Sequence, residues 1–338
     1  MNCRLLTAAP LVRFSCRLVS RVIQTPCRTC SSSREDDIRN YIKESYVRIG
    51  KDAAPPPVIR GDVVYGTLPC MAAISGQKRR VHRVFVPSSL RSRDGRRELT
   101  YALQDILATV RNVHPTALHP LPEKYMYECL SQCGVHEYPD HEGIALELEP
   151  LHARPLISNR ELLRIANRDT KTGAPPLVLA CPFAQDMTNL GHLIRIAYYY
   201  GVHTVLVSSR FRQAQAINAI ASSSSQGAVD LVDMVAVKGK LSISLEEWKR
   251  KFRIVGTVGM GYAGAVPLSE FKHDGRPVLL IMGSESKGIA DPLVDICTDL
   301  VTIPACEVSN EATGSGVLES LNVSVAASIL LHHITSSA

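Results

Sequence analysis

Four polar residues in the C-terminal half of this chain have types and spacing that could do chemistry. They are Asn189 and Arg195, six residues apart, then Glu285 soon after an apolar run, and Asn322 before another. Amide, guanidinium and carboxylate groups can orient a hydroxyl group and stabilise the negative charge that it develops. The set therefore suits the activation of an oxygen nucleophile for an in-line group transfer.

Arg195 is predicted to lie on a helix over residues 190–200 that begins near Asn189 and ends at Gly201. On that helix Gly191 and Arg195 share one face. An asparagine at a helix start is often only an N-cap, and an arginine on a helix is often a solvated surface charge. In the functional interpretation Arg195 lowers the pKa of a hydroxyl by its charge, because a guanidinium does not lose its proton near neutral pH.

The segment Gly283-Ser284-Glu285 follows a predicted apolar strand over residues 277–282. Backbone N–H groups in such a turn can bind a carboxylate or the edge of an adenine, and glycine allows the close approach. Glu285 then orients one of the other three polar residues or the substrate. The alternative is a capping acid for a helix that starts near Ile289.

The predicted site is expected to gain an apolar wall and a polar helix start from two further segments, Ile303-Pro304 and Leu321-Asn322. Asn322 stands in an otherwise apolar stretch. This predicts a buried amide, which needs partners from a ligand or from the segment around Asn189. Alternatively, Ser320 or Asn322 only caps the closing helix predicted over residues 321–334.

Alternating apolar runs and helical segments predict an α/β fold with a mainly parallel sheet that is covered on both faces. Its strands are expected at residues 177–180, 204–207, 253–258 and 277–282, and its helices at 190–200, 214–221 and 321–334. A separate α/β segment precedes it, with an apolar run at 63–66, strands at 81–86 and 143–148, and helices at 68–73 and 99–110.

Residues 259–264, Gly-Met-Gly-Tyr-Ala-Gly, match the GxGxxG pattern of dinucleotide-binding folds. That fold requires a helix to begin at the glycines, but Pro267, Asp274-Gly275 and Pro277 interrupt the residues that follow. Nucleotide binding through this loop is therefore disfavoured. The glycines are expected to shape a tight loop at the carboxyl edge of the sheet, where ligands of open α/β folds bind.

The first 34 residues differ from the rest of the chain. They contain six arginines, several serines and no acidic residue, a composition typical of a mitochondrial transit peptide and not of a secretory signal. A disordered basic tail is the alternative. After this leader we expect a linker over 35–57, a domain over 58–153, a second linker over 154–174 and a second domain over 175–338.

The net charge of +6 comes from this leader, because without its six arginines the chain has 32 basic and 32 acidic residues. A phosphate-binding surface must therefore be a local patch. Residues 75–97 form such a patch with a local charge of +7, although a solvated loop is the alternative. Its basic residues, set against Asp94 alone, are Lys78, Arg79, Arg80, Arg83, Arg91, Arg93, Arg96 and Arg97.

The ten cysteines are scattered, and the one CxxC pair has neither a second pair nor histidines beside it. Neither a disulfide framework nor a metal site is expected from this pattern. The chain also lacks an apolar run of the roughly 18 residues that a membrane span needs. The sequence therefore predicts a protein without a metal or a membrane among its partners.

Three segments resemble, in order and spacing, the motifs of the SpoU/TrmH branch of the SPOUT superfamily, whose members methylate ribose 2′-hydroxyls in RNA with S-adenosylmethionine. The segments are 186–201, 281–289, and Ile303-Pro304 together with 320–326. The first has Asp186-Met187-Thr188-Asn189 where the family has Asp-Pro-x-Asn, and the loop 305–319 is longer than is common. Residues 58–153 are similar to the L30e-like substrate-binding domain of the family.

The resemblance implies a C-terminal SPOUT domain, a parallel sheet with a deep trefoil knot, preceded by the L30e-like α/β domain. It also implies a homodimer with the active site at the subunit interface. By position, the family's catalytic group corresponds to Asn189, Arg195, Glu285 and Asn322, and its cofactor site to Gly283, Ile303 and Leu321, with Thr257 and Pro304 beside them.

Arg195 would then bridge an RNA phosphate and the reacting ribose at a domain or subunit edge. The patch would contact RNA phosphates, which position a nucleic acid without reading its sequence. The residues expected to make these contacts are Lys78, Arg79, Arg80, Arg83, Arg91 and Arg93.

The function expected from the resemblance is 2′-O-methylation, dependent on S-adenosylmethionine, of a ribose in mitochondrial large-subunit ribosomal RNA. Guanosine is the expected nucleoside, and the leader places the protein in the mitochondrial matrix. One alternative is a transfer-RNA 2′-O-methyltransferase. The other is a ribosome-assembly factor that binds RNA without catalysis, against which the presence of all four residues of the catalytic group argues.

Overall fold

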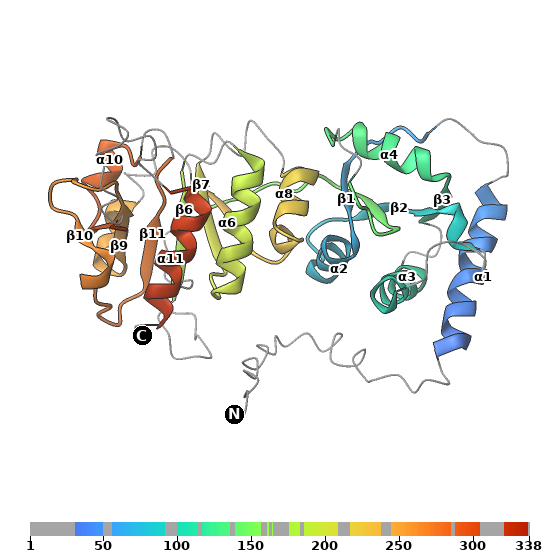
Figure 1. Ribbon diagram of the computed structural model, residues 1–338, viewed down its shortest axis with the longest axis horizontal. Coiled ribbons are helices and arrows are strands. Elements are labelled where there is room, and N and C mark those ends of the chain that lie inside the picture. Colours follow the sequence, from blue (N-terminus) through green and yellow to red (C-terminus); the bar gives the residue numbers. More distant parts are fainter. Residues whose placement is uncertain are drawn as a thin grey trace, which may run out of the picture.

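The computed structural model describes residues 31–49, 56–91, 100–113, 117–135, 139–156, 161, 164, 176–182, 186–208, 217–237, 245–284, 288–304 and 321–336. These residues form two α/β units that follow one another along the long axis of the molecule (Figure 1). Most of the predicted leader and the whole loop 305–319 lie outside the described residues. No helix among the described residues combines the length and the apolar character that crossing a membrane requires.

The N-terminal unit is a mixed sheet in the order β1–β4–β2–β3. Its strands are β1 (Asp62–Tyr65), β2 (Val81–Pro87), β3 (Leu118–Leu121) and β4 (Ala145–Leu148). β4 runs antiparallel to β1 and β2, whereas β3 runs parallel to β2. Side chains alternate between two cores: one face packs on α1 (Ser31–Ile49), α2 (Thr67–Gly76) and α3 (Tyr101–Val113), and the other on α4 (Glu123–Ser131).

Helix α1 corrects the prediction of a linker over residues 35–57. Ile38, Tyr41 and Ile42 on this helix are buried in the N-terminal core, at the spacing of an amphipathic helix face. Nη1 of Arg39 also donates a hydrogen bond of 2.8 Å to the carbonyl of Leu90. The helix therefore belongs to the N-terminal unit, and it begins inside the segment predicted as leader.

The C-terminal unit contains an eight-stranded sheet in the order β10–β12–β9–β11–β6–β7–β8–β5, in which every pairing is parallel. This confirms the predicted α/β class with a mainly parallel sheet. The strands are β5 (Arg154–Pro155), β6 (Leu177–Cys181), β7 (Thr204–Ser208), β8 (Asp233–Val237), β9 (Arg253–Thr257), β10 (Val266–Pro267), β11 (Val278–Ile281) and β12 (Asp299–Thr302).

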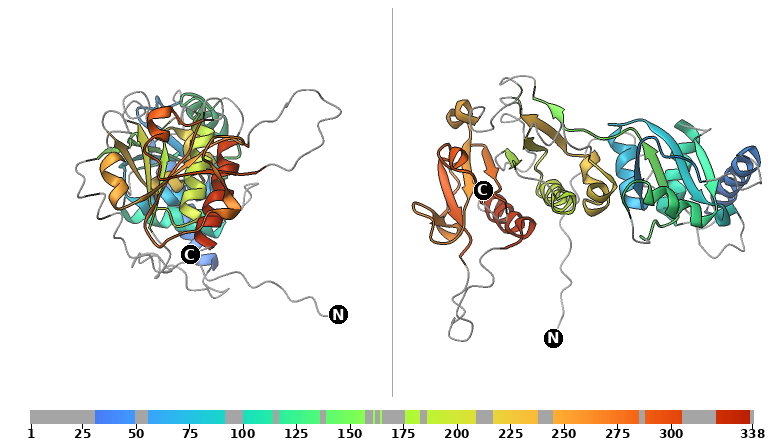
Figure 2. Two further views of the ribbon diagram at one scale, coloured as in Figure 1. Left: turned by 90° about the vertical axis from the view of Figure 1, so that its left-hand side faces the viewer. Right: turned by 90° about the horizontal axis from the view of Figure 1, so that it is seen from above.

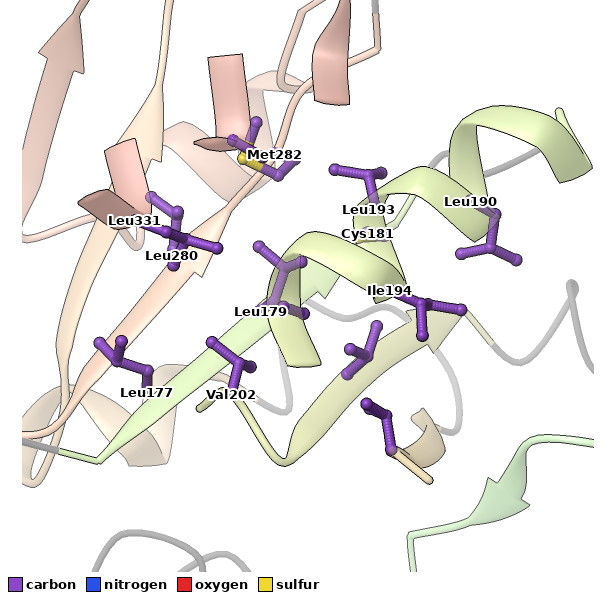
Figure 3. Packing of buried hydrophobic residues seen from close by; sticks show 14 of the residues in the cluster. Leu177, Leu179, Cys181, Leu190, Leu193, Ile194, Val202, Leu280, Met282 and Leu331 are labelled. Carbon is purple, nitrogen blue, oxygen red and sulfur yellow. The ribbon is translucent and has the colours of Figure 1, made fainter. Parts of the chain in front are cut away.

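Helices cover both faces of this sheet. On one face α6 (Met187–Tyr199) and α11 (Val323–Ser336) bury Leu193, Ile194 and Leu331 against Leu179 and Leu280 of the strands (Figure 3). The other face packs on α10 (Asp291–Val294) and on the short helix η4 (Glu247–Arg250). Because neither face meets water, the central strands are almost wholly apolar, which is why their sequences do not alternate.

Residues 151–155 join the C-terminal sheet and so correct the predicted start of the second linker at residue 154. β5 pairs with β8, and Leu151 forms an antiparallel bridge with Ile217. Nε of Arg154 donates to the carboxylate of Asp233 at 2.7 Å, a hydrogen bond that raises the pKa of Arg154. The link between the two units is therefore attached to the sheet edge from its first residues.

The glycine-rich segment 259–264 opens no helix. After β9 the chain passes through turns into β10 and the short helix η5 (Leu268–Glu270). A dinucleotide-binding fold would place a crossover helix at these glycines. The prediction of a loop at the carboxyl edge of the sheet is therefore confirmed.

Candidate active site

Three neighbouring strands bring predicted cofactor-binding residues together. β12, β9 and β11 are adjacent in the sheet, and their carboxyl ends lead to Ile303, Thr257 and Gly283. The hydroxyl of Thr257 donates to the carbonyl of Ile281 at 3.1 Å and accepts from the N–H of Gly283 at 3.3 Å. Thr257 thereby ties β9 to the turn after β11, at the sheet edge where ligands of parallel sheets bind.

Gly283 occupies a position with no room for a side chain. A Cβ atom there would lie 2.7 Å from the carbonyl carbon of Gly288. Ser284 and Gly288 exchange backbone hydrogen bonds of 2.9 and 2.8 Å, which bring the two ends of this turn together. Glu285 lies between them, outside the described residues, so its predicted role stays a prediction.

The hydroxyl of Thr302 is a candidate ligand-binding group that sequence reasoning missed. Its oxygen is buried and has no hydrogen-bond partner among the described residues. It lies at the end of β12, directly before the half-buried Ile303 and the exposed Pro304. Because a buried hydroxyl without a partner is unfavourable, this position fits a ligand with polar and apolar parts, such as a nucleoside. The signal in the sequence is only a threonine at a strand end.

A hydrogen bond joins two of the predicted catalytic residues. Nδ2 of Asn322 donates to Oδ1 of Asn189 at 3.1 Å, across 133 residues of sequence. Oδ1 of Asn322 accepts from the N–H of Ser324 at 2.9 Å, so the same side chain also caps α11. The prediction that Asn322 is buried is wrong, because it lies exposed at the helix start. The prediction that the segment around Asn189 supplies its partner is confirmed.

The contact between Asn189 and Asn322 does not compete with capping of α6, because another residue caps this helix. The carboxylate of Asp186 accepts the N–H groups of Thr188 and Asn189 at 2.7 and 3.0 Å, which is the geometry of an N-cap. The helix therefore begins earlier than predicted, at Met187. The capping role considered for Asn189 belongs to Asp186.

Arg195 is exposed on α6, two turns after Asn189. No residue in the described part of the chain forms a hydrogen bond or an ion pair with its guanidinium. Gly191, one turn before Arg195, is buried against the helix over residues 219–224. One side of α6 is therefore packed, and Arg195 lies on a different, exposed side of the helix. Leu321, at the start of α11, is also exposed, and its contact with a cofactor stays a prediction.

The structure overturns the prediction that Arg79 contacts RNA. Its side chain is 1% exposed and forms ion pairs with Asp62 at 2.9 Å and with Asp230 at 2.7 Å. An RNA phosphate cannot approach a guanidinium that is enclosed by protein and already paired with two carboxylates. The three cations in a row at residues 78–80 hid this difference, because sequence alone does not show which side chain turns inward.

Two further patch residues make contacts within the protein. Nζ of Lys78 donates to the backbone carbonyls of Val229 and Val232 in the C-terminal unit. Arg83 pairs with the carboxylate of Glu147. Burial is the largest influence and raises the pKa of Glu147, but the bond and charge of Arg83, together with the N–H groups of Arg60 and Gly61, make the net shift downward. Of the predicted contact residues, Arg80 remains exposed, and the side chains of Arg91 and Arg93 are not among those described.

Comparison with known proteins gives the same assignment as the motifs. Residues 176–332 match the model of the SpoU rRNA Methylase family. The chain is 28% identical over 289 residues to rRNA methyltransferase 1, mitochondrial, of Homo sapiens, an alignment that covers 83% of this chain and 74% of the relative. It is 32% identical over 199 residues to an uncharacterized tRNA/rRNA methyltransferase of Mycobacterium avium, covering 58% of this chain and little more than half (56%) of that relative.

Solved structures share the fold. One is the SpoU methyltransferase AviRb from Streptomyces viridochromogenes in complex with AdoMet, with a TM-score of 0.56, 21% identity, and coverage of 81% of this chain and 89% of that one. Another is the AdoMet-bound rRNA methyltransferase from Sinorhizobium meliloti, with a TM-score of 0.57, 17% identity, and coverage of 89% and 93%. At these identities the likeness concerns the fold.

The parallel sheet with its gathered motif residues and the family match define the class: this is an RNA methyltransferase. More particularly, residues 176–332, which carry the site, match the model of the SpoU rRNA Methylase family. These residues contain all three motifs that indicate the family in the sequence. The match begins at the residue before β6 and ends within α11, so it covers the central sheet and the helices that carry Asn189, Arg195 and Asn322.

Proposed function

We propose that this protein methylates the 2′-hydroxyl of a ribose, in a guanosine, in the large-subunit ribosomal RNA of mitochondria. The hydrogen bond between Asn189 and Asn322 carries the proposal, because it joins the first and third motifs at the start of α6, the helix that follows β6, the neighbour of β11 in the sheet. The human relative is named as a mitochondrial rRNA methyltransferase and aligns over most of the chain, which supports the substrate and the organelle. The arginine-rich leader supports import into the matrix.

The methyl donor is S-adenosylmethionine, which supplies an electrophilic methyl group when bound. The residues of this chain that would hold it are at the ends of β9, β11 and β12, where Thr257, Gly283, Ile303 and Pro304 meet. Thr302 adds a buried hydroxyl without a partner among the described residues. The AviRb and Sinorhizobium structures, which share this fold, contain AdoMet.

The chain's own contribution to the chemistry is to position and polarise the ribose hydroxyl. The positive charge of Arg195 favours the developing alkoxide, and mutations that remove such stabilisation typically cost about 10²–10³ in rate. Asn189 and Asn322 hold one another and so fix the start of α6 against the start of α11. Glu285 is proposed to orient this group.

A homodimer with a site shared between subunits is part of the proposal. α6 and α11 each leave apolar side chains exposed: Tyr199 is 81% exposed, Val325 47% and Ile329 38%. Val325 and Ile329 are one helical turn apart and so share a face of α11. A second copy of this chain that covers these helices would bury the apolar side chains and approach Arg195, which lies on α6 four residues before Tyr199.

The N-terminal unit is proposed to bind the RNA as an L30e-like domain. Arg79 is buried, and Lys78 and Arg83 are bonded to groups of the protein itself, so the phosphate contacts are assigned to Arg80, Arg91 and Arg93. Each contact of this kind neutralises a phosphate and releases counterions, so replacing Arg80 with alanine should make binding less dependent on salt.

A transfer assay tests the proposal. The purified protein is incubated with S-adenosylmethionine that carries a labelled methyl group and with transcripts of the mitochondrial large-subunit RNA, and the digested RNA is analysed by mass spectrometry. We expect 2′-O-methylguanosine at a single position. Methylation of transfer RNA in place of ribosomal RNA would contradict the proposed substrate, and tight RNA binding without transfer would favour the assembly-factor alternative.

A further inference from the structure

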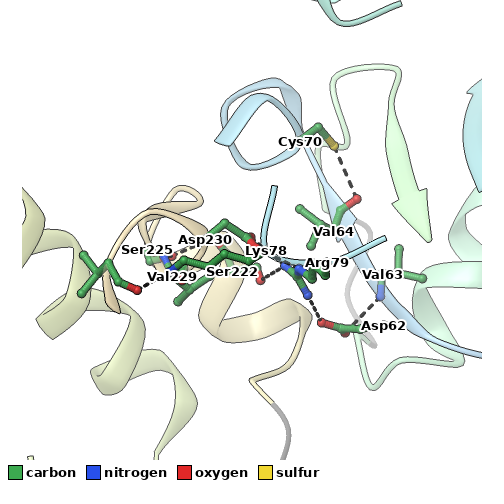
Figure 4. A network of polar contacts seen from close by, with 11 residues as sticks. Asp62, Val63, Val64, Cys70, Lys78, Arg79, Ser222, Ser225, Val229 and Asp230 are labelled. Atoms are coloured by element: carbon green, nitrogen blue, oxygen red, sulfur yellow. Dashed lines mark hydrogen bonds and ion pairs between the residues drawn. The ribbon is translucent and has the colours of Figure 1, made fainter. Parts of the chain in front are cut away.

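The two units of the protein meet at a buried cluster of charges centred on Arg79 (Figure 4). Its Nε and Nη2 atoms donate to the two carboxylate oxygens of Asp230 at 2.9 and 2.7 Å, and its Nη1 donates to Asp62 at 2.9 Å. Asp62 opens β1 of the N-terminal unit, whereas Asp230 ends the short helix η3 (Ala228–Asp230) of the C-terminal unit. One guanidinium therefore binds a carboxylate of each unit.

The cluster is enclosed and electrically balanced. The side chains of Arg79, Asp62 and Asp230 are 1%, 9% and 0% exposed, and Lys78 adds a second positive charge beside them. Burial raises the pKa of Asp62 against the opposing effect of Arg79, and it lowers the pKa of Lys78 against the effect of Asp230. Buried charges contribute little net stability, but losing one partner is costly, so such a cluster specifies one arrangement of its surroundings.

The backbones of the two units also touch, so little sliding is possible at this boundary. A Cβ atom on Gly76, at the end of α2, would lie 2.3 Å from the carbonyl oxygen of Asp230. A Cβ atom on Gly227 would lie 2.5 Å from the Cβ of Ala72 and 2.8 Å from the Cα of Pro69. Glycines on both sides allow this approach, and any larger residue would force the units apart.

From this boundary one short helix leads to the active site. The hydroxyl of Ser222 on α8 (Ala219–Ser224) accepts from Nη2 of Arg79 at 3.4 Å. On its other side α8 packs against α6, where a Cβ atom on Gly191 would lie 1.9 Å from Oγ of Ser224 and 2.8 Å from the carbonyl oxygen of Ala221. Figures 1 and 2 both show α8 between α6 and the N-terminal unit.

We propose that Arg79 is a positioning residue for the methyl transfer, an inference that rests on the proposed function. By binding Asp62 and Asp230 together, Arg79 fixes the position of the RNA-binding unit relative to α6, which we call the register of the two units. RNA bound by the first unit then presents one particular ribose to Asn189 and Arg195. The buried cluster thereby helps to determine which nucleotide is methylated, although none of its charges touches RNA.

The variant Asp230→Ala tests this role, because it removes the C-terminal half of the contact and leaves the catalytic residues in place. Misplacement of a substrate by about 1 Å can cost about 100-fold in rate, so we expect kcat/KM on long ribosomal RNA to fall at least about tenfold. Methyl groups should also appear on riboses next to the normal target. S-adenosylmethionine should bind as in the wild type, and Asp230→Asn, which keeps a hydrogen-bond acceptor, should recover part of the activity.

The matched control is Asp274→Ala, which breaks an exposed ion pair with Arg276 in the same unit, away from the boundary. It should keep the wild-type rate and target. A merely structural loss would lower kcat with the folded fraction and leave the methylated position unchanged. A folded Asp230→Ala protein that methylates the wild-type position at the wild-type kcat/KM would overturn the inference. Should Asp230→Ala not fold, Arg79→Lys takes its place with the same readouts and the same two outcomes.

A distance measurement separates this inference from the proposed function. Labels introduced through non-natural amino acids at the exposed Tyr101 of α3 and Lys272 of the C-terminal unit report the distance between the units. We expect one narrow distance in the wild type and a broad distribution in Asp230→Ala. A broad distribution in the wild type contradicts the fixed register even if the RNA is methylated. A narrow one in a protein that transfers no methyl group contradicts the proposed function and leaves the register intact.

Discussion

At the residue scale, the oxygen and the nitrogen of the Asn322 amide make two different contacts, and substitutions can remove one contact without the other. Its oxygen caps α11 through the N–H of Ser324, and its nitrogen donates to Asn189. Sequence reasoning considered these roles as alternatives, and the structure shows both at once. An amide can accept from a helix N-terminus with its oxygen and donate elsewhere with its nitrogen at the same time.

We therefore expect Asn322→Asp and Asn322→Ala to differ. The aspartate keeps the cap and places a favourable negative charge at the helix N-terminus, so its stability should be close to that of the wild type, whereas the alanine should lose about 1 kcal/mol. Both should lose methyl transfer, because neither donates to Asn189. Urea unfolding and initial rates measure the two effects; an active Asn322→Asp protein would show that the contact with Asn189 is dispensable.

Arg195 is the second residue whose role can be measured directly. Replacement by alanine removes the charge that we propose lowers the pKa of the ribose hydroxyl, so kcat should fall by about 10²–10³. The dissociation constant of S-adenosylmethionine, measured by calorimetry, should stay near the wild-type value. Arg276→Ala, which removes an exposed arginine elsewhere on this unit, serves as control. Undiminished turnover would remove Arg195 from the mechanism.

The residues show where prediction from sequence ends. Asn189, Arg195 and Asn322 are identified by motif order, and the structure brings the two asparagines into contact. Arg79 looks in the sequence like its neighbours Lys78 and Arg80, and its partner Asp230 lies 151 residues further on. Tertiary packing alone decides which of three adjacent cations is buried.

At the scale of the elements, an ion pair clamps two of the strands that lead to the cofactor site. Arg253 of β9 binds Asp299 of β12 through two hydrogen bonds of 2.7 Å, and its guanidinium stacks over the ring of Phe271 at 4.3 Å. The hydrogen bond from Arg253 lowers the pKa of Asp299, against the raising effect of burial. The clamp sits at the amino end of β9, opposite the end that carries Thr257.

This lowered pKa predicts how stability changes with pH. A carboxyl whose pKa is lower in the folded state stabilises the fold above its unfolded value of 3.8, and this contribution is lost as pH falls through the folded pKa. Asp299→Asn should therefore cost up to roughly 1 kcal/mol at pH 7 and progressively less in acid. Urea unfolding at a series of pH values measures the difference, and a constant gap between wild type and variant would contradict this linkage.

The elements that sequence reasoning found are those with long, uniform patterns. β6, β7, β9 and β11 are continuous apolar runs, and α6 and α11 show clear helical spacing. Two of the missed strands are less distinct: β3 contains His119 and Pro120, and β12 begins with Asp299 and ends with Thr302. β8 was also missed, although four of its five residues are apolar. α1 was missed because its charged, weakly amphipathic sequence resembles a linker, and only packing in the N-terminal core reveals its buried face.

At the scale of the whole molecule, the exposed apolar faces of α6 and α11 predict the assembly. We expect Ile329→Asp to convert the proposed dimer into a monomer and to reduce methyl transfer, because a charge in an apolar interface lacks a partner. Light scattering coupled to size-exclusion chromatography measures the mass. Val58→Asp, at an exposed valine of the N-terminal unit, is the control and should stay dimeric. An active wild-type monomer at working concentration would contradict the shared site.

The helix α1 has a consequence for maturation of the protein after its proposed import into mitochondria. A processing protease that removes the arginine-rich leader must cut before Ile38, because a cut further along would take away side chains that fill the N-terminal core. Once α1 has folded against that core, its peptide bonds are also shielded from a protease, which needs an extended substrate. The fold of the first domain thus sets the limit of proteolytic trimming, and the mature N-terminus is expected just ahead of this helix.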